Sequence, residues 1–210
     1  MSEKKLRLIM AIVGVCVTGI NVGIFRWLVL GTDPCTSWII GISNIFSAPY
    51  SVTYPIVFAV LFLIVFLLHR HYLGIATVIN LFGIGIIADL TLAAMEALVT
   101  DPSMAFRIVL LVVNVIILSW ASSLYFTADL GVSAYDAIAL MAANEYKIAQ
   151  FRVCRVTTDI FCVIFGFIFG ADIGIGTVIT AFMMGPIVQF FNENFSEPLL
   201  KSKRKVRHLR

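Results

Sequence analysis

Six long apolar stretches decide most of what this chain can fold into. A helix of about 20 apolar residues crosses the roughly 30 Å of hydrocarbon in a bilayer. With 60% hydrophobic and 13% charged residues, the chain has too few polar side chains to cover a water-soluble domain. We therefore predict an all-α integral membrane protein. The six expected membrane-spanning helices are residues 6–29, 52–68, 73–99, 105–126, 153–169 and 173–195.

Basic residues between these stretches predict the orientation of the chain. They collect on alternate connections, and cytoplasmic loops of membrane proteins carry the excess of Lys and Arg. With six crossings, both termini are then expected in the cytoplasm. The basic groups are Lys4, Lys5 and Arg7, then Arg70, then Lys147, Arg152 and Arg155, and finally a cytoplasmic tail at residues 196–210; Arg26 and Arg107 depart from the pattern.

The chain resembles itself at an offset of one hundred residues. The segment "LGTDPCTSW" at 30–38 aligns with "LGVSAYDAI" at 130–138. At the same offset, "LGIATVI" at 73–79 aligns with "IGIGTVI" at 173–179, where five of seven positions are identical. One gapless offset that serves both landmarks indicates a duplication.

The duplication predicts two repeats of opposite orientation within a single membrane domain, residues 1–210. Repeat 1 covers about 6–99 and repeat 2 about 105–195. Three predicted crossings separate equivalent positions, and an odd number inverts the second copy. Inverted repeats are typical of many secondary transporters, although channels and non-transporting membrane proteins also use them.

Two further apolar segments are too short to cross the bilayer. "CTSWIIGISNIF" at 35–46 and "AYDAIALMAANEY" at 134–146 follow the two glycine motifs. About 12 residues of helix rise only about 18 Å. We expect two short helices, interfacial or re-entrant, and irregular backbone at membrane depth needs protein or a water-filled cavity to satisfy it.

The residues before these short segments are typical of helix starts. Asp33 is a good N-cap and Pro34 suits a first helical turn, while Gly31 permits a sharp turn. In the second copy, Ser133 followed by Asp136 resembles a capping box. Capping alone accounts for these residues.

A functional interpretation adds that two helix N-termini could bind a ligand at the bundle centre. Exposed N–H groups at a helix start favour anions. The two aspartates oppose an anion, and they suit a cation, a proton or a zwitterion better. The candidate substrate-binding residues are Gly31, Asp33, Thr36, Gly131, Ser133 and Asp136.

These motifs, together with a closing "GIGTVITAFMMGP" at 174–186, resemble the YczE-like family of bacterial integral membrane proteins, which is related to the YitT and YyaS proteins. The family's first motif usually reads P-W-D, where this chain has Cys35 and Thr36 after its proline. The second copy retains Asp136 but has Ala134 in the proline position. The resemblance implies a six-helix protein of the bacterial inner membrane, with roles that range from transport to assisting lipopeptide synthesis.

Two charged residues within the predicted spans are expected to pair. Arg26 near the end of the first span and Asp89 in the third lie at similar depth on the outer side. A charge in hydrocarbon costs at least about 2.5 kcal/mol and therefore needs a partner or a cavity. This buried ion pair could be structural, or it could serve as a gate or substrate contact.

Three carboxylates on the inner side form a candidate proton or cation site. Asp159 lies four residues after Arg155, so the two share one helix face. Asp136 and Asp129 are expected on the same side of the membrane. We assign proton or ion coupling to Asp136 and Asp159, while the Arg155–Asp159 pair has a purely structural alternative.

The chain lacks sequence signatures of an enzyme. It has no G-x-S-x-G elbow, phosphate-binding loop or His/Glu metal spacing, and its histidines lie in basic loops, where they serve most simply as topology signals. We expect no catalytic residue, cofactor or metal. Expected partners are the lipid bilayer and an unknown small molecule, with homodimerisation left open and no nucleic acid.

The leading hypothesis is a small secondary transporter that works by alternating access of its inverted repeats, with proton coupling as an option. A substrate-binding membrane subunit resembling the S components of energy-coupling-factor transporters is the first alternative. A non-transporting membrane factor that assists a biosynthetic enzyme is the second. The inverted repeat favours the transporter, because a subunit that captures ligand from one side gains nothing obvious from it.

Overall fold

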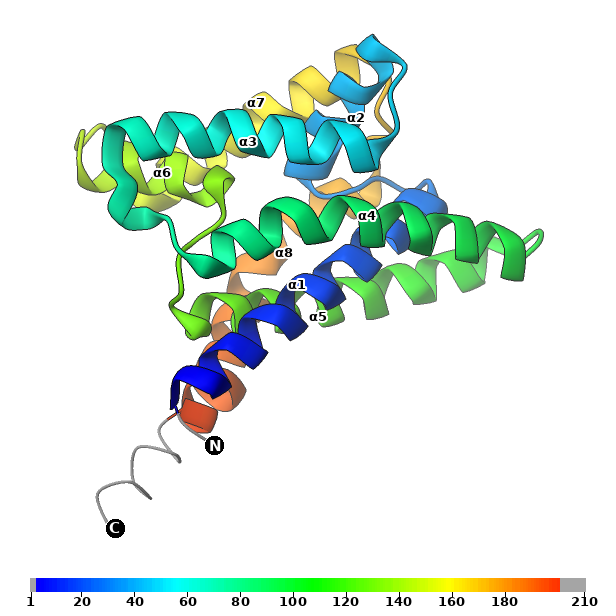
Figure 1. Cartoon of the computed structure of the whole chain (residues 1–210). Coiled ribbons are helices and arrows are strands. Elements are labelled where there is room, and N and C mark those ends of the chain that lie inside the picture. The colour runs from blue at the N-terminus through cyan, green and yellow to red at the C-terminus, as the bar shows by residue number, and fades with distance from the viewer. Residues whose placement is uncertain (1–2, 201–210) are drawn as a thin grey trace.

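The described part of the chain, residues 3–200, is helical and contains no β-strand in this computed structural model (Figure 1). Ten helical elements follow one another along the chain. They are α1 (Glu3–Leu28), α2 (Pro34–Phe46), α3 (Tyr50–His69), the 3₁₀ turn η1 (Arg70–Tyr72), α4 (Ile75–Leu98), α5 (Met104–Ala128), α6 (Ala134–Asn144), α7 (Phe151–Ile168), α8 (Ile175–Phe191) and the π-helical turn η2 (Asn192–Ser196). Residues 201–210, most of the predicted basic tail, lie outside the described residues.

Five helices of the described chain are long and apolar enough to cross a membrane. They include every predicted span except 153–169. The helix at that place, α7, carries Arg152, Arg155 and Asp159 within 18 residues, so its charge sets it apart from the others. The five candidate spans are Glu3–Leu28, Tyr50–Tyr72, Ile75–Leu98, Met104–Ala128 and Ile175–Leu200.

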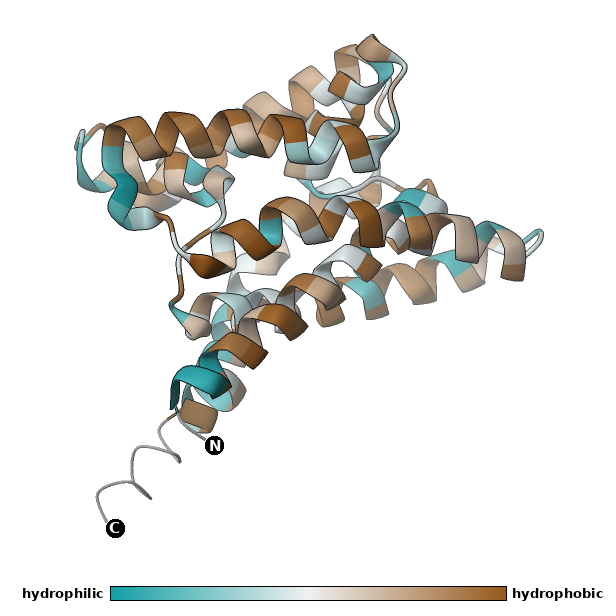
Figure 2. Cartoon of the chain, in the orientation of Figure 1, coloured by the Kyte–Doolittle hydropathy of each residue, from teal (hydrophilic) through white to brown (hydrophobic). Residues whose placement is uncertain are grey.

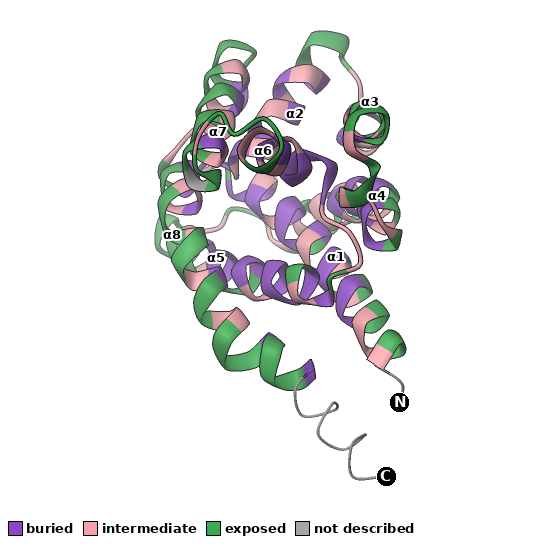
Figure 3. Cartoon of the chain, turned by 90° about the vertical axis from the view of Figure 1, so that its left-hand side faces the viewer, coloured by how far each residue is buried: buried purple, intermediate pink, exposed green. Residues whose placement is uncertain are grey.

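The helices form two groups, which lie one above the other in Figures 1 and 3. In the lower group α1 packs on α4 and α5, and α5 packs on α8. In the upper group α7 packs on α2 and α6, while α3 packs on α2 and α6. The contact of α3 with α4 joins the two groups. The short helices α2 and α6 therefore each contact both longer helices of the upper group, α3 and α7.

Burial changes along both short helices in the same way. Each begins with buried residues, around Pro34 in α2 and Ala134 in α6, and ends at exposed ones, Phe46 and Asn144. Figure 3 shows this change along α2, whose start lies inside the bundle. The helix starts, which carry the polar motifs, are thus the interior ends of the two short helices.

The surface of the long helices is apolar over most of its area. Exposed side chains on α3, α4 and α5 are mainly Val, Ile, Leu and Phe, and these helices are largely brown in Figure 2. A water-soluble monomer rarely exposes such continuous apolar surface. With the five candidate spans, this surface indicates a membrane protein.

The connections sort onto two sides of the molecule. In Figure 1 the N-terminus, the α3–α4 connection and the α6–α7 connection lie toward the left, whereas the α2–α3 and α4–α5 connections lie toward the right. The left-hand group contains the basic residues Arg7, Arg70 and Lys147. The basic connections of the described chain thus share one side.

Candidate functional site

The start of α2 is a tightly hydrogen-bonded turn inside the bundle. Gly31 adopts φ +96°, a left-handed conformation that favours glycine, and reverses the chain after α1. The Asp33 carboxylate then accepts a hydrogen bond from the Thr36 N–H at 3.1 Å, as expected of an N-cap. Thr36 is buried, and its hydroxyl lies 3.5 Å from that of Tyr50 on α3.

The start of α6 has the same backbone design. Gly131 adopts φ +104°. The Ser133 hydroxyl accepts a hydrogen bond from the Asp136 N–H at 3.0 Å and donates one to the Asp136 carboxylate at 2.6 Å. Both residues are buried, with exposed fractions of 8% and 9%. The cap thus fixes the Asp136 carboxylate in the interior.

Each glycine turn is joined to the long helix of the other half of the chain. The Leu30 carbonyl accepts a hydrogen bond from the Gly176 N–H at the start of α8, at 2.8 Å. The Leu130 carbonyl accepts one from the Ala76 N–H at the start of α4, at 3.0 Å. The two bonds connect residues that are equivalent at the offset of one hundred.

Glycine is required where these segments cross. A Cβ atom on Gly74 would lie 2.0 Å from the Leu130 oxygen, and one on Gly174 would lie 2.4 Å from the Leu30 oxygen. Real Cβ atoms do not approach backbone so closely, and a methyl group here would push the two segments apart. The "LGIATVI" and "IGIGTVI" motifs thus supply the small residues that let helix and turn touch.

Four side chains from α6 and α7 form a charged group, which we call the Arg155 cluster: Tyr135, Asp136, Arg155 and Asp159. Arg155 forms ion pairs with Asp136 and, at 3.3 Å, with Asp159. The Tyr135 hydroxyl donates a hydrogen bond to Asp159 at 2.6 Å, and the guanidinium lies 4.6 Å from the centre of the Tyr135 ring. The two carboxylates that we assigned to coupling therefore share one arginine.

The start of α2 belongs to the same electrostatic environment. Asp33 lies in the connection before α2, outside the five candidate spans. Burial raises the pKa of its carboxyl above the ordinary value, and hydrogen bonds from Thr36 oppose this effect. The nearby charges of Asp159 and Arg155 also act on the pKa of Asp33, in opposite directions. The start of α2 therefore lies close enough to the Arg155 cluster for their charges to interact, although the carboxylates paired with Arg155 are Asp136 and Asp159.

Arg26 and Asp89 form the second charged group. Their side chains make an ion pair at 2.5 Å between α1 and α4. The other oxygen of Asp89 accepts a hydrogen bond from the Ser51 N–H at 2.8 Å, at the start of α3. Arg26 also lies 4.6 Å from the centre of the Tyr50 ring. The pair thus joins three helices, which is a structural role. Arg26 also lines a hollow on the side of the α2–α3 connection, where it could contact a bound molecule.

A hollow of about 330 Å³ leads toward the start of α2 from the side of the α2–α3 connection. Arg26, Thr32, Tyr50 and Glu96 contribute to its wall. Ser43 also lines it, and its buried hydroxyl has no hydrogen-bond partner among the described residues. Buried polar groups are normally hydrogen-bonded. The Ser43 hydroxyl is therefore an unpaired polar group of the described chain beside the hollow.

The candidate substrate-binding and coupling residues lie on three segments: the start of α2, the start of α6, and α7. Asp129 lies apart from the Arg155 cluster and faces Arg7 at 3.8 Å, so the carboxylates that pair with Arg155 are Asp136 and Asp159. Tyr50 and Tyr135 were not among the candidates, because an aromatic residue in an apolar sequence shows no signal that separates it from core. Gly31, Asp33 and Thr36 lie at the start of α2, Gly131, Ser133 and Asp136 at the start of α6, and Asp159 on α7.

Comparison with known proteins gives a family without an established activity. Residues 5–193 match DUF6198, a family of unknown function, and the chain belongs to this family. An uncharacterized protein of Haemophilus influenzae is 26% identical over 120 residues, which is 57% of this chain and 53% of that protein. The chain thus aligns with about half of that relative's length. No solved structure matches the chain.

Proposed function

We propose that this member of the DUF6198 family is a small-molecule secondary transporter of the bacterial inner membrane, built from two inverted repeats of three membrane-spanning helices each. The substrate would bind between the starts of α2 and α6. The resemblance to YczE-like proteins rests on the same two motifs and is part of this proposal. Alternating access would follow from exchange of conformation between the halves.

The crossed pair of contacts at the glycine turns carries the proposal. Leu30 with Gly176 and Leu130 with Ala76 are the same contact made twice, with the halves exchanged. The helix packing repeats the pattern, because α2 contacts α7 and α6 contacts α3, while α1 contacts α4 and α5 contacts α8. This pairing is expected of two related halves that interlock, and not of unrelated helices.

The proposal counts α7 as the sixth crossing despite its charges. Two of them, Arg155 and Asp159, pair with each other, and Arg155 also pairs with Asp136 of α6. Charged groups inside membrane proteins commonly pair in this way and mark functional sites. With six crossings, both ends of the chain lie in the cytoplasm with the basic connections.

The charges favour a cationic or zwitterionic substrate, with proton coupling through the Arg155 cluster. Asp136 and Asp159 outnumber the single arginine with which both pair. A proton or a substrate cation would balance the excess negative charge. The hollow beside Thr32 and Ser43 provides a route to the α2 start from one side.

Transport in reconstituted vesicles tests the proposal. Purified protein in proteoliposomes is exposed to a panel of amino acids and small amines, with an imposed pH gradient, and charge movement is recorded on a solid-supported membrane. We expect at least one solute to produce protein-dependent current. Asp136→Asn and Asp159→Asn should then abolish gradient-driven uptake.

Asp101→Asn is the matched control. Asp101 is exposed in the α4–α5 connection with φ +60°, a conformation that asparagine also tolerates. This variant should transport as the unchanged protein does. Uptake that persists in both cluster variants would remove the coupling role. Absence of transport together with co-purified ATPase subunits would point to a substrate-binding subunit instead.

The sixth crossing has its own check in the same vesicles. Ile148→Cys and Asp172→Cys place exposed thiols before and after α7. An impermeant maleimide should reach the two positions from opposite sides of the membrane. Labelling from the same side would contradict the three-helix repeat even if transport were observed.

A further inference from the structure

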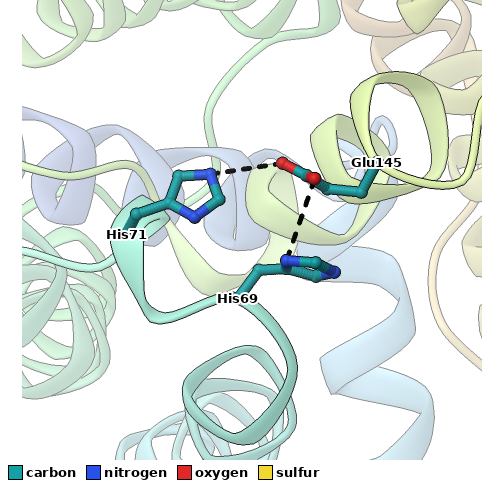
Figure 4. A group of neighbouring side chains, drawn as sticks. All are labelled: His69, His71 and Glu145. Carbon is teal, nitrogen blue, oxygen red and sulfur yellow. Dashed lines mark ion pairs between the residues drawn. The ribbon is translucent and has the colours of Figure 1, made fainter.

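A third group of ionisable side chains lies away from the helix starts, where the α3–α4 connection meets the end of α6. His69 Nδ1 lies 3.9 Å from one oxygen of Glu145, and His71 Nε2 lies 3.3 Å from the other. Figure 4 shows both imidazoles directed at the same carboxylate. The three ligand atoms all lie within 4.8 Å of one another.

The fold brings these residues together through two short local structures. The 3₁₀ turn η1 follows α3 directly, and it presents His71 next to His69, with ring centres 5.9 Å apart. Glu145 follows α6, and its backbone N–H is bonded to the Met141 carbonyl. From the sequence we expect no metal here, because Glu145 is more than seventy residues away from the histidines.

The carboxylate is also oriented by a neighbouring hydroxyl. Tyr72 donates a hydrogen bond to Glu145 at 3.2 Å, and Asn144 donates one to Tyr72 at 3.4 Å. Such outer contacts fix the direction of a metal ligand and are common around metal sites. Neither hydrogen bond involves the histidines, and His69 Nδ1 and His71 Nε2 point at the carboxylate.

We propose that His69, His71 and Glu145 form a binding site for a divalent transition-metal ion, with zinc as the best match. Two imidazoles and one carboxylate, with a fourth position open to water, make up a known tetrahedral zinc ligand set. Zinc bonds of about 2.1 Å place neighbouring ligand atoms about 3.4 Å apart. The present separations, up to 4.8 Å, are larger than this, so the exposed side chains of His71 and Glu145 and the half-buried His69 would have to move closer together.

The position of this site decides which parts of the chain a bound ion would connect. His69 ends α3, His71 lies in η1 and Glu145 follows α6, so the ion would join one half of the chain to the other on the side that carries the basic connections. Arg70 and Lys147 are nearby but exposed, where solvent and salt screen their charges. Binding of the ion does not depend on the protein being a transporter.

Titration of the purified full chain with zinc chloride tests the site. The protein is dialysed against a chelator, freed of any polyhistidine tag, and followed by calorimetry. We expect one zinc ion per chain, and a higher unfolding temperature with the ion bound. His71→Gln and Glu145→Gln should each weaken binding about 10-fold or more. The side chain of His71 is 59% exposed, so this variant removes a ligand with little effect on folding.

His208→Gln is the matched control, because His208 is the third histidine of the chain and lies outside the described residues. It should bind zinc as the unchanged protein does. Cobalt(II) reports the ligand type: visible bands without thiolate charge transfer are expected, since the site has no cysteine. No binding, a thiolate band, or affinity that survives both His71→Gln and Glu145→Gln would overturn the proposal.

Discussion

The starts of α2 and α6 share a backbone and differ in their chemistry. Both follow a glycine with positive φ, both are capped by a side chain, and both contact the opposite long helix through a glycine. At the α6 start, however, the carboxylate of Asp136 is bound to Arg155. At the equivalent position of α2, the uncharged Thr36 faces Tyr50.

This difference separates the backbone features that the two helix starts share from the charged side chains that only one of them has. The glycines and caps solve the same geometric problem at both helix starts, so both starts have them. The charged cluster occurs once, because Arg155 pairs with Asp136 at the α6 start and with Asp159 on α7, while the α2 start has Thr36 at the equivalent position. If the protein transports a solute, the two glycine turns with their caps would have similar backbones in both conformations. The Arg155 cluster would have no counterpart in the other half of the chain.

The largest expected effect comes from the shared backbone. Gly174→Ala and Gly74→Ala place a methyl group within 2.4 Å and 2.0 Å of a carbonyl oxygen. Each should lower the free energy of unfolding by about 3 kcal/mol, the upper end for overpacking. Thermal unfolding in detergent measures this loss, and the two variants should behave alike.

Gly185→Ala is the control for these variants. It lies within α8, and a Cβ there meets nothing within 4 Å. This change should be neutral or stabilise the helix by about 0.5–1 kcal/mol. A loss confined to one of Gly74 and Gly174 would show that the two crossings are not equivalent.

A smaller effect is expected from the charges that occur only once. Arg155→Gln leaves Asp136 and Asp159 without their cation. We expect a loss of about 2 kcal/mol, below the roughly 3–5 kcal/mol of a fully buried pair, because the Arg155 side chain is 31% exposed. Adding Asp136→Asn to Arg155→Gln should recover part of the loss in the same unfolding assay.

Thr36→Val tests the equivalent position of α2. It removes the Thr36 hydroxyl, which makes the long 3.5 Å contact with Tyr50 and also hydrogen-bonds to Asp33, and should cost about 1 kcal/mol. A cost equal to that of Arg155→Gln would remove the distinction between the two helix starts.

The smallest expected effect concerns the pH dependence contributed by Asp33. Burial raises its pKa in the folded protein above its ordinary value of 3.8. The folded state therefore holds this proton more tightly than the unfolded state, and ionisation lowers stability as the pH rises through the window above that value. Asparagine is as good an N-cap as aspartate and does not ionise.

The measurement compares unfolding temperatures of the Asp33→Asn variant and the unchanged protein between pH 8 and pH 4. The unchanged protein should gain stability relative to the variant as the pH falls. A constant difference across this range would show that Asp33 does not change its protonation between the two states.

Much of the helical framework can be predicted from the sequence. The apolar stretches mark five candidate spans, and Asp33 and Ser133 mark the starts of the two short helices. The pairing of Arg26 with Asp89 is expected from their similar depth, and the two residues form an ion pair in the structure. Local hydrophobicity and capping suffice for these predictions because they depend on neighbours along the chain or on position across the bilayer.

Tertiary structure decided which polar groups meet. Asp129 and Asp136 are close in sequence, yet Asp129 faces Arg7 while Asp136 faces Arg155. His69 and His71 meet Glu145 only because α3 packs on α6. The sequence by itself determined the membrane-spanning character and the helix starts, which follow from local free energies. The contacts among charged side chains were decided by helix packing, because side-chain pairing depends on the relative placement of helices that are far apart in the chain.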